Sequence, residues 1–139
     1  MICPVDNKDM IVVEYKNIEL DHCLYCNGVW FDSNELELLL RCLGLDTPEL
    51  LLGHILDQPD SESKEKQRRC PICRRKMKKT SVGDKPKIVI DACVRKDGLW
   101  FDGGEVAQLV KELAKKRPPR KEAQQQMLAF LADTFKARA

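Results

Sequence analysis

A fourteen-residue motif that occurs twice constrains this chain more than any other feature. Residues 23–36 read CLYCNGVWFDSNEL, and residues 93–106 read CVRKDGLWFDGGEV. The first cysteine, the glycine, the Trp-Phe-Asp triplet and the glutamate recur at one offset of 70 residues, and both tryptophans of the chain lie in the motif. Such an internal repeat predicts two units of similar structure.

Each copy of the motif is preceded by another cysteine turn and a two-strand pattern. The turns read CPVD at residues 3–6 and CPIC at residues 70–73. Apolar and β-branched runs with period-two alternation then predict β-hairpins over residues 10–21 and 77–91. After each Trp-Phe, the Asp-x-x-Glu spacing is that of a helix cap, so helices are expected to begin near Ser33 and Gly103.

The remaining sequence predicts a linker and a terminal helix. A short apolar helix and a charged linker are expected between the units, and apolar residues at helical spacing near the C-terminus predict an amphipathic helix. The expected fold is a small metal-bound α+β protein with two tandem ribbon units. The expected segments are residues 1–45 for unit one, 46–69 for the linker, 70–117 for unit two and 118–139 for the terminal helix.

The cysteine spacing of unit one predicts a zinc site. Structural zinc takes four ligands in a tetrahedron, and two short turns on a hairpin supply them in the arrangement called a zinc ribbon. Unit one offers Cys3, Cys23 and Cys26, and Asp6 stands where a fourth cysteine is expected. A carboxylate oxygen is an acceptable zinc ligand, so Asp6 is the expected fourth ligand.

Unit two offers three cysteines for a second zinc ion, namely Cys70, Cys73 and Cys93. Lys96 stands where unit one has Cys26, and a protonated lysine is a poor zinc ligand. The alternative is a ribbon that has lost its metal and is held by packing against unit one. The candidates for a fourth ligand are Asp97, Asp102, His54 from the linker region, or water.

Three further residue types, in the motif and in the helix after it, carry structural expectations. Gly28 and Gly98 lie where a metal knuckle needs a residue with positive φ. Trp30 and Trp100 are expected in the core, because large rings beside a knuckle are more often packed than exposed. Cys42, beside an apolar helical face, is expected to be a small buried hydrophobe.

At these residues the sequence resembles the TFIIB-type zinc-ribbon family of small, mostly uncharacterised prokaryotic proteins. The family pattern is Cys-Pro-x-Cys or Cys-Pro-x-Asp, a hairpin, and then Cys-x-x-Cys-x-Gly-x-Trp-aliphatic-Asp-x-x-Glu-Leu. Unit one matches with Phe31 at the aliphatic position, and unit two matches except for Lys96 and Val106. The resemblance implies a zinc-bound ribbon like that of the transcription factor that contacts RNA polymerase.

Charge is distributed unevenly along the chain. Residues 1–60 carry 3 basic and 12 acidic side chains, and residues 61–139 carry 21 and 10. The tandem ribbons are therefore expected to form a platform whose basic half meets nucleic acid, a component of the transcription machinery or another acidic protein partner, unless its charges only keep the surface solvated. The candidate nucleic-acid-binding residues are Lys64, Lys66, Arg68, Arg69, Arg74, Arg75, Lys76, Lys78 and Lys79.

Two other function classes remain open from the sequence. The acidic and basic units could pair between chains, which would make the protein a dimerisation module. An incomplete three-cysteine site could handle metal or activate water, although the sequence offers no HxE, HExxH or phosphate-binding glycine loop, and a non-catalytic protein is expected. Seven cysteines without an apolar signal segment or transmembrane run favour a reducing cytoplasm.

Overall fold

The computed structural model describes residues 1–15, 17–42, 44, 55–56, 67–82 and 88–116. Several sequence-based expectations fall outside these residues. They are the linker region with His54, Lys64 and Lys66, apart from Ile55 and Leu56, and the C-terminal helix over residues 118–139. None of the described helices has the length and apolar character needed to cross a membrane.

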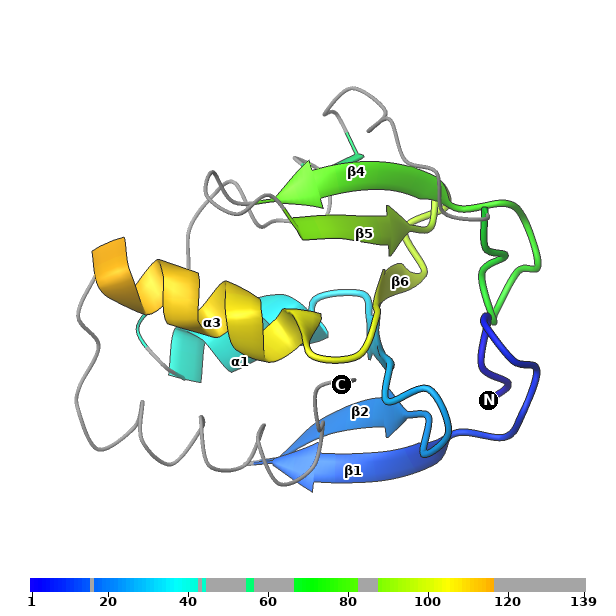
Figure 1. Cartoon of the computed structure of the whole chain (residues 1–139), viewed down its shortest axis with the longest axis horizontal. Helices are drawn as coiled ribbons and strands as arrows, with labels where there is room; N and C mark the ends of the chain where they lie inside the picture. The colour runs from blue at the N-terminus through cyan, green and yellow to red at the C-terminus, as the bar shows by residue number, and fades with distance from the viewer. Residues whose placement is uncertain (16, 43, 45–54, 57–66, 83–87, 117–139) are drawn as a thin grey trace.

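Both predicted hairpins are present. In unit one, β1 (Ile11–Tyr15) pairs antiparallel with β2 (Ile18–His22), and in unit two β4 (Lys78–Val82) pairs with β5 (Ile88–Ala92). Alternate side chains of β2 are buried, as the period-two pattern predicted. The hairpins form the two outer arms of the molecule (Figure 1).

A third strand in each unit was not predicted, and it joins the two units into one sheet. The Trp-Phe segments form β3 (Val29–Asp32) and β6 (Gly98–Phe101), which pair antiparallel with Trp30 opposite Trp100. The result is a six-stranded sheet with the order β1-β2-β3-β6-β5-β4. The units are therefore related by an approximate two-fold axis at the β3–β6 pair. In two separate ribbons β3 and β6 would be exposed edge strands, and here they pair with each other.

Two helices pack on one side of this sheet, between the hairpin arms (Figure 1). They are α1 (Glu35–Cys42) and α3 (Glu105–Lys116), and each begins two residues later than predicted. The delay follows from Asn34 and Gly104, which have φ of 72° and 85° and therefore lie outside the helical region.

The central strands separate two apolar clusters. Phe31 and Phe101 face the helices and meet edge to face, with ring centroids 5.4 Å apart. Trp30 and Trp100 point to the other side and are fully buried in a cluster that also holds cysteines of both units. The expectation that both tryptophans belong to the core is thus confirmed.

The expectation for Cys42 was wrong. This residue ends α1 and is exposed, while Leu36, Leu39 and Leu40 form the buried face of the helix. An eight-residue helix buries only one stripe, and Cys42 lies outside that stripe.

Candidate metal centres

The four side chains expected to hold metal in unit one lie together. The thiol groups of Cys3, Cys23 and Cys26 and a carboxylate oxygen of Asp6 all lie within 4.8 Å of one another. The Sγ atoms of Cys3 and Cys26 are 3.6 Å apart, and Cys23 Sγ lies 3.2 Å from Asp6 Oδ2. The three cysteines are buried and Asp6 is half-buried, so the site opens to solvent only at its carboxylate.

A matching group of four lies in unit two. It consists of Cys70, Cys73, Cys93 and Asp97, again with all donor atoms within 4.8 Å of one another. Cys73 and Cys93 have their Sγ atoms 3.6 Å apart, and Asp97 Oδ2 lies 3.3 Å from Cys93 Sγ. Among the four candidates for the fourth position, the structure thus brings Asp97 to the thiols.

The spacing of these donor atoms fits tetrahedral zinc. With zinc–sulfur bonds near 2.3 Å and zinc–oxygen bonds near 2.0 Å, a tetrahedron places two sulfurs about 3.8 Å apart and a sulfur and an oxygen about 3.5 Å apart. One pair of sulfurs in each unit is 3.6 Å apart, and three sulfur–oxygen pairs are 3.2 to 3.6 Å apart. Both groups are therefore already close to the geometry of a three-sulfur, one-oxygen site.

Backbone amides donate hydrogen bonds to several of the cysteine sulfurs, which favours their negatively charged thiolate form. The amides of Val5 and Ile72 donate to Cys3 Sγ and Cys70 Sγ at 3.4 Å, and the Gly28 amide donates to Cys26 Sγ at 3.4 Å. Hydrogen bonds to the charged form stabilise a thiolate, which is the form that binds metal.

The pKa values show how protons are shared in unit one. The hydrogen bond with Cys3 lowers the pKa of Cys26 to about 6, while that hydrogen bond and burial raise the pKa of Cys3. Burial opposes a low pKa for Asp6, but the Lys8 amide and neighbouring thiols lower it. The site therefore holds protons that zinc must displace, so its affinity falls in acid.

The last knuckle of unit two reaches the same geometry by a different turn. In unit one the ligand Cys26 precedes the left-handed residue Asn27, whose φ is 63°. In unit two the left-handed residue comes first, because Lys96 has a φ of 64° and Asp97 follows it. The Lys96 amide bonds to the Cys93 carbonyl at 2.9 Å, which closes a turn one residue tighter than that between Asn27 and Cys23. Lys96 is thus the bend of the knuckle, and Asp97 takes the ligand position.

The expected positive φ at Gly28 and Gly98 was wrong, and close packing explains these glycines instead. A Cβ on Gly28 would lie 2.2 Å from Cζ2 of Trp100, and one on Gly98 would lie 2.2 Å from the Phe31 carbonyl and 2.6 Å from Cζ2 of Trp30. Each tryptophan ring therefore lies on the glycine of the other unit. The left-handed bends fall on neighbouring residues instead.

The aspartates of the two Asp-x-x-Glu segments form hydrogen bonds with the tryptophans. Asp32 and Asp102 accept hydrogen bonds from the indole nitrogens of Trp30 and Trp100 at 2.8 and 3.1 Å. A buried indole N–H needs an acceptor, which is why these carboxylates turn toward the rings. Glu35 does reach back to the Asp32 amide at 2.8 Å, as the capping box predicted.

The predicted nucleic-acid-binding residues that the structure describes differ in exposure and in their contacts. Arg69, Arg74, Arg75 and Lys76 are exposed and Arg68 is half-buried. Lys79 is occupied by an ion pair with buried Asp91 at 2.9 Å, and Lys78 donates to the Leu56 carbonyl at 2.8 Å, so these two do not belong to the free basic surface.

One exposed basic residue of the last knuckle, Arg95, was missed. The repeat could have revealed it, since unit one has the neutral residue Tyr25 at this place.

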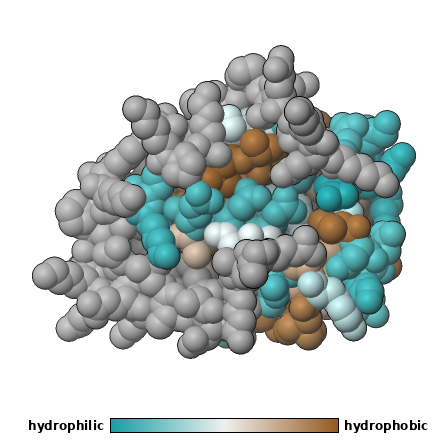
Figure 2. All heavy atoms as spheres, viewed as in Figure 1, coloured by the Kyte–Doolittle hydropathy of each residue, from teal (hydrophilic) through white to brown (hydrophobic). Residues whose placement is uncertain are grey.

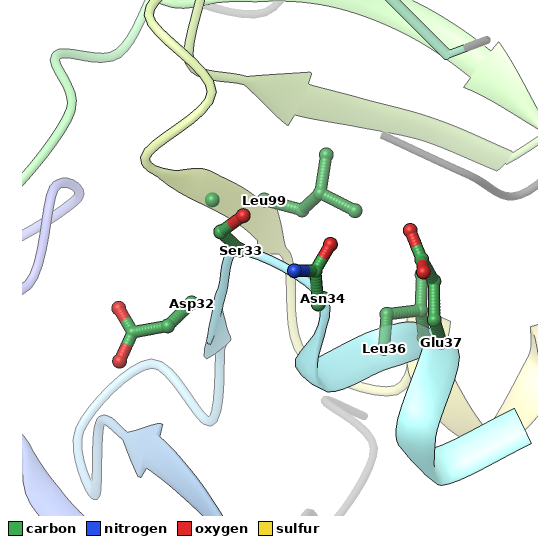
Figure 3. Close-up of a pocket in the computed structure, with 7 residues that line it drawn as sticks. Asp32, Ser33, Asn34, Leu36, Glu37 and Leu99 are labelled. Carbon is green, nitrogen blue, oxygen red and sulfur yellow. The ribbon is translucent and has the colours of Figure 1, made fainter. Parts of the chain in front are cut away.

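A small cavity lies where β3 runs into α1 against β6 (Figure 3). Asp32, Asn34 and Glu37 from unit one and Leu99 from unit two are among the residues that line it. Its volume of about 10 Å³ is that of one water molecule. It is too small for an organic substrate.

Comparisons with known proteins agree with the geometry of unit one. Residues 2–41 match a family model described as a transcription factor zinc-finger of the TFIIB zinc-ribbon type. No curated protein and no solved structure matches the chain. Residues 2–41 therefore match the TFIIB-type zinc-ribbon family, and the cysteine cluster at Cys70, Cys73 and Cys93 suggests a second ribbon-like site in the same chain.

Proposed function

We propose that the protein is a non-catalytic scaffold, stabilised by two zinc ions, that binds nucleic acid through the knuckles of unit two. Each candidate site has four ligands, which is the composition of a structural zinc site rather than of a catalytic site with an open position. Zinc would hold the knuckles in place, and the side chains on the knuckles would make the contacts.

The observation that carries this proposal is a difference between the two units at matched positions. The first knuckle of unit one carries Ile2, Asn7, Lys8 and Asp9, where unit two carries Arg69, Arg74, Arg75 and Lys76. The second knuckle has Tyr25 in unit one and Arg95 in unit two. Lys8 and Arg75 are both basic, but the other matched positions of unit one are neutral or acidic, so the ribbon itself does not require the charges of Arg69, Arg74, Lys76 and Arg95.

The charge of the metal sites does not explain the additional basic residues of unit two either. Three thiolates and one carboxylate around Zn²⁺ give a site of formal charge about −2, and this donor set is the same in both units. Unit one balances that charge without an arginine on its knuckles. Within the described residues, Arg74, Arg75 and Lys76 make no ion pair, so their charge is available to phosphate groups.

The test is the binding of the zinc-loaded protein to a fluorescent twelve-nucleotide oligonucleotide at several salt concentrations. Phosphate contacts release counterions, so the affinity should fall steeply as salt rises. Replacing Arg75 and Lys76 together by glutamine should weaken binding by about tenfold. The absence of any binding at low salt would refute the proposal.

A second candidate is association between chains, which the acidic side of unit one favours. In unit two Lys79 neutralises Asp91, but Val12 stands opposite Asp21 in unit one. Burial and nearby carboxylates accordingly raise the pKa of Asp21. A basic surface of another copy would relieve this repulsion. Light scattering at low and high salt tests the idea, since such a dimer should separate in high salt.

A reducing compartment such as the cytoplasm fits the proposed zinc chemistry, because the described cysteines are all free thiols.

A further inference from the structure

A groove lies between the first knuckles of the two units, and neither zinc site uses it. Its volume is about 220 Å³, and none of the residues that line it is a proposed metal ligand. One side comes from the N-terminal segment of unit one and the other from residues 67–74 of unit two. These loops lie close together at the end of the molecule that carries the N-terminus (Figure 1).

One part of the groove is apolar. Ile2, Pro4 and Val5 of unit one and Pro71 of unit two line it, and the two prolines are equivalent residues of the Cys-Pro knuckles. All four side chains are half-buried, so they are held in place and still present a surface. On the same side of the molecule, Figure 2 shows an apolar patch flanked by hydrophilic side chains. Such a surface suits the flat face of an aromatic ring.

The other part of the groove is basic. Arg68, Arg69 and Arg74 line it, and none of the described residues brings a carboxylate to it. Arg69 Nη1 donates to the Arg74 carbonyl at 3.1 Å, which holds its guanidinium beside the knuckle. Arg74 is exposed and lies in the left-handed bend of the knuckle, with a φ of 66°. Guanidinium groups are suited to the oxygens of a phosphate.

We propose that this groove binds one nucleotide of a single-stranded nucleic acid, with the base on the apolar side and its phosphate at the arginines. The inference rests on the proposed function and adds the place of binding and the preference for single strands. Bases in a duplex are stacked and paired, whereas an unpaired base can lie on a protein surface while basic groups follow the backbone. The groove is large enough for one such group and too small for a double helix.

The central test compares two glycine substitutions in the full, zinc-loaded chain. Arg74→Gly and Lys96→Gly each remove one positive charge from an exposed residue with a left-handed φ, where glycine is unstrained. Only Arg74 lines the groove. Fluorescence anisotropy with labelled oligo(dT) of twelve nucleotides should show binding weakened about tenfold or more by Arg74→Gly and less than about threefold by Lys96→Gly.

A second pair of variants tests the apolar side. Ile2→Glu introduces a carboxylate into the groove, and Ile11→Glu introduces the same group on the exposed edge of β1. Ile2→Glu should weaken binding about tenfold, and Ile11→Glu should change it less than about threefold. Zinc content and the near-ultraviolet circular dichroism spectrum establish that each variant is folded.

The outcomes separate the two proposals. Tight binding of oligo(dT) with equal losses for Arg74→Gly and Lys96→Gly would overturn the groove and leave general nucleic-acid binding in place. A duplex of twelve base pairs that binds as tightly as oligo(dT) would also overturn the groove. Failure of the unmodified protein to bind either oligonucleotide would overturn the proposed function, and the groove with it.

Discussion

The glycine and the tryptophan of each motif act across the centre of the molecule. Gly28 leaves room for the ring of Trp100, and Gly98 leaves room for the ring of Trp30. Both rings are fully buried and each is held by a carboxylate of its own unit. Glycine and tryptophan therefore recur in both copies of the motif because the tryptophan of each copy packs on the glycine of the other.

Gly28→Ala should destabilise the protein by about 1–3 kcal/mol, because the new methyl group would overlap the indole of Trp100. Urea denaturation of the zinc-loaded protein measures the loss. The control is Gly44→Ala, which has open space around it but a φ of 70°. Its cost should be about 1 kcal/mol and should leave the near-ultraviolet spectrum of the tryptophans unchanged. An unchanged tryptophan spectrum in Gly28→Ala would contradict the packing described here.

Asp97→Ala should reduce the zinc content from two ions per chain to one, because it removes the oxygen donor that the described part of the chain supplies to that site. Asp97→Cys should keep two ions, since a thiolate is an equally acceptable ligand. Asp102→Asn serves as the control, because Asp102 bonds to Trp100 rather than to the thiols. Zinc per chain after gel filtration is the measurement. Two tightly bound ions in Asp97→Ala would show that another group completes the site.

Residue spacing predicted which four side chains lie together in unit one but left open which group joins the three cysteines of unit two. The spacing of residues in the sequence does not show which residue of a turn has a positive φ. The exchange of order between Lys96 and Asp97 depends on which of them has positive φ, and this is a property of the folded knuckle. The reason for Gly28 was missed on similar grounds, because its contact lies 72 residues away in the sequence.

The junction of β3 and α1 gathers carboxylates beside the helix start. Burial, together with the charges of Asp32 and Asp21, raises the pKa of Glu35 from its ordinary value of 4.5 to about 7, although the hydrogen bond from the Asp32 amide lowers it. The folded chain therefore binds a proton here that the unfolded chain has released between about pH 4.5 and 7. Stability contributed by this group is lost as the pH rises through that range.

Glu35→Gln should remove this loss while keeping an oxygen that can accept from the Asp32 amide. Relative to the unmodified protein, the variant should become more stable as the pH rises from 5.5 to 8. Denaturation at a fixed zinc concentration across this range is the measurement, with Glu37→Gln of the same helix as the matched control. A stability difference that does not change with pH would contradict the assigned proton.

The hairpins and helices could be predicted from the sequence, but the pairing of the two units into one sheet could not. Both hairpins and the buried faces of both helices follow from short-range patterns of period two and 3.6. The β3–β6 pairing forms between segments about 70 residues apart, and four-residue apolar runs can be read as core without being strands. The two expected ribbons are consequently one sheet.

The whole molecule is built around a core that both candidate metal sites share. Cysteines of both units and both tryptophans belong to one buried cluster. The Asp97 carbonyl also accepts a hydrogen bond from the Ser33 amide at 3.0 Å, which ties the second site to unit one. The two sites are therefore expected to be coupled in stability.

Cys23→Ser should release the zinc of unit one and unfold unit two as well, because zinc binding supplies about 10 kcal/mol or more of folding energy in small zinc domains. Near-ultraviolet circular dichroism should lose the signal of both tryptophans together. Cys42→Ser is the control, since Cys42 is exposed and distant from either site. A variant that keeps half of the signal and one tightly bound zinc would show that the units are independent.

The most direct measurement for the whole account is native mass spectrometry of the protein purified without chelator. The account predicts two zinc ions per chain, with Asp97→Ala retaining one. A single zinc in the unmodified protein would contradict it, because unit two would then be a packing partner without metal.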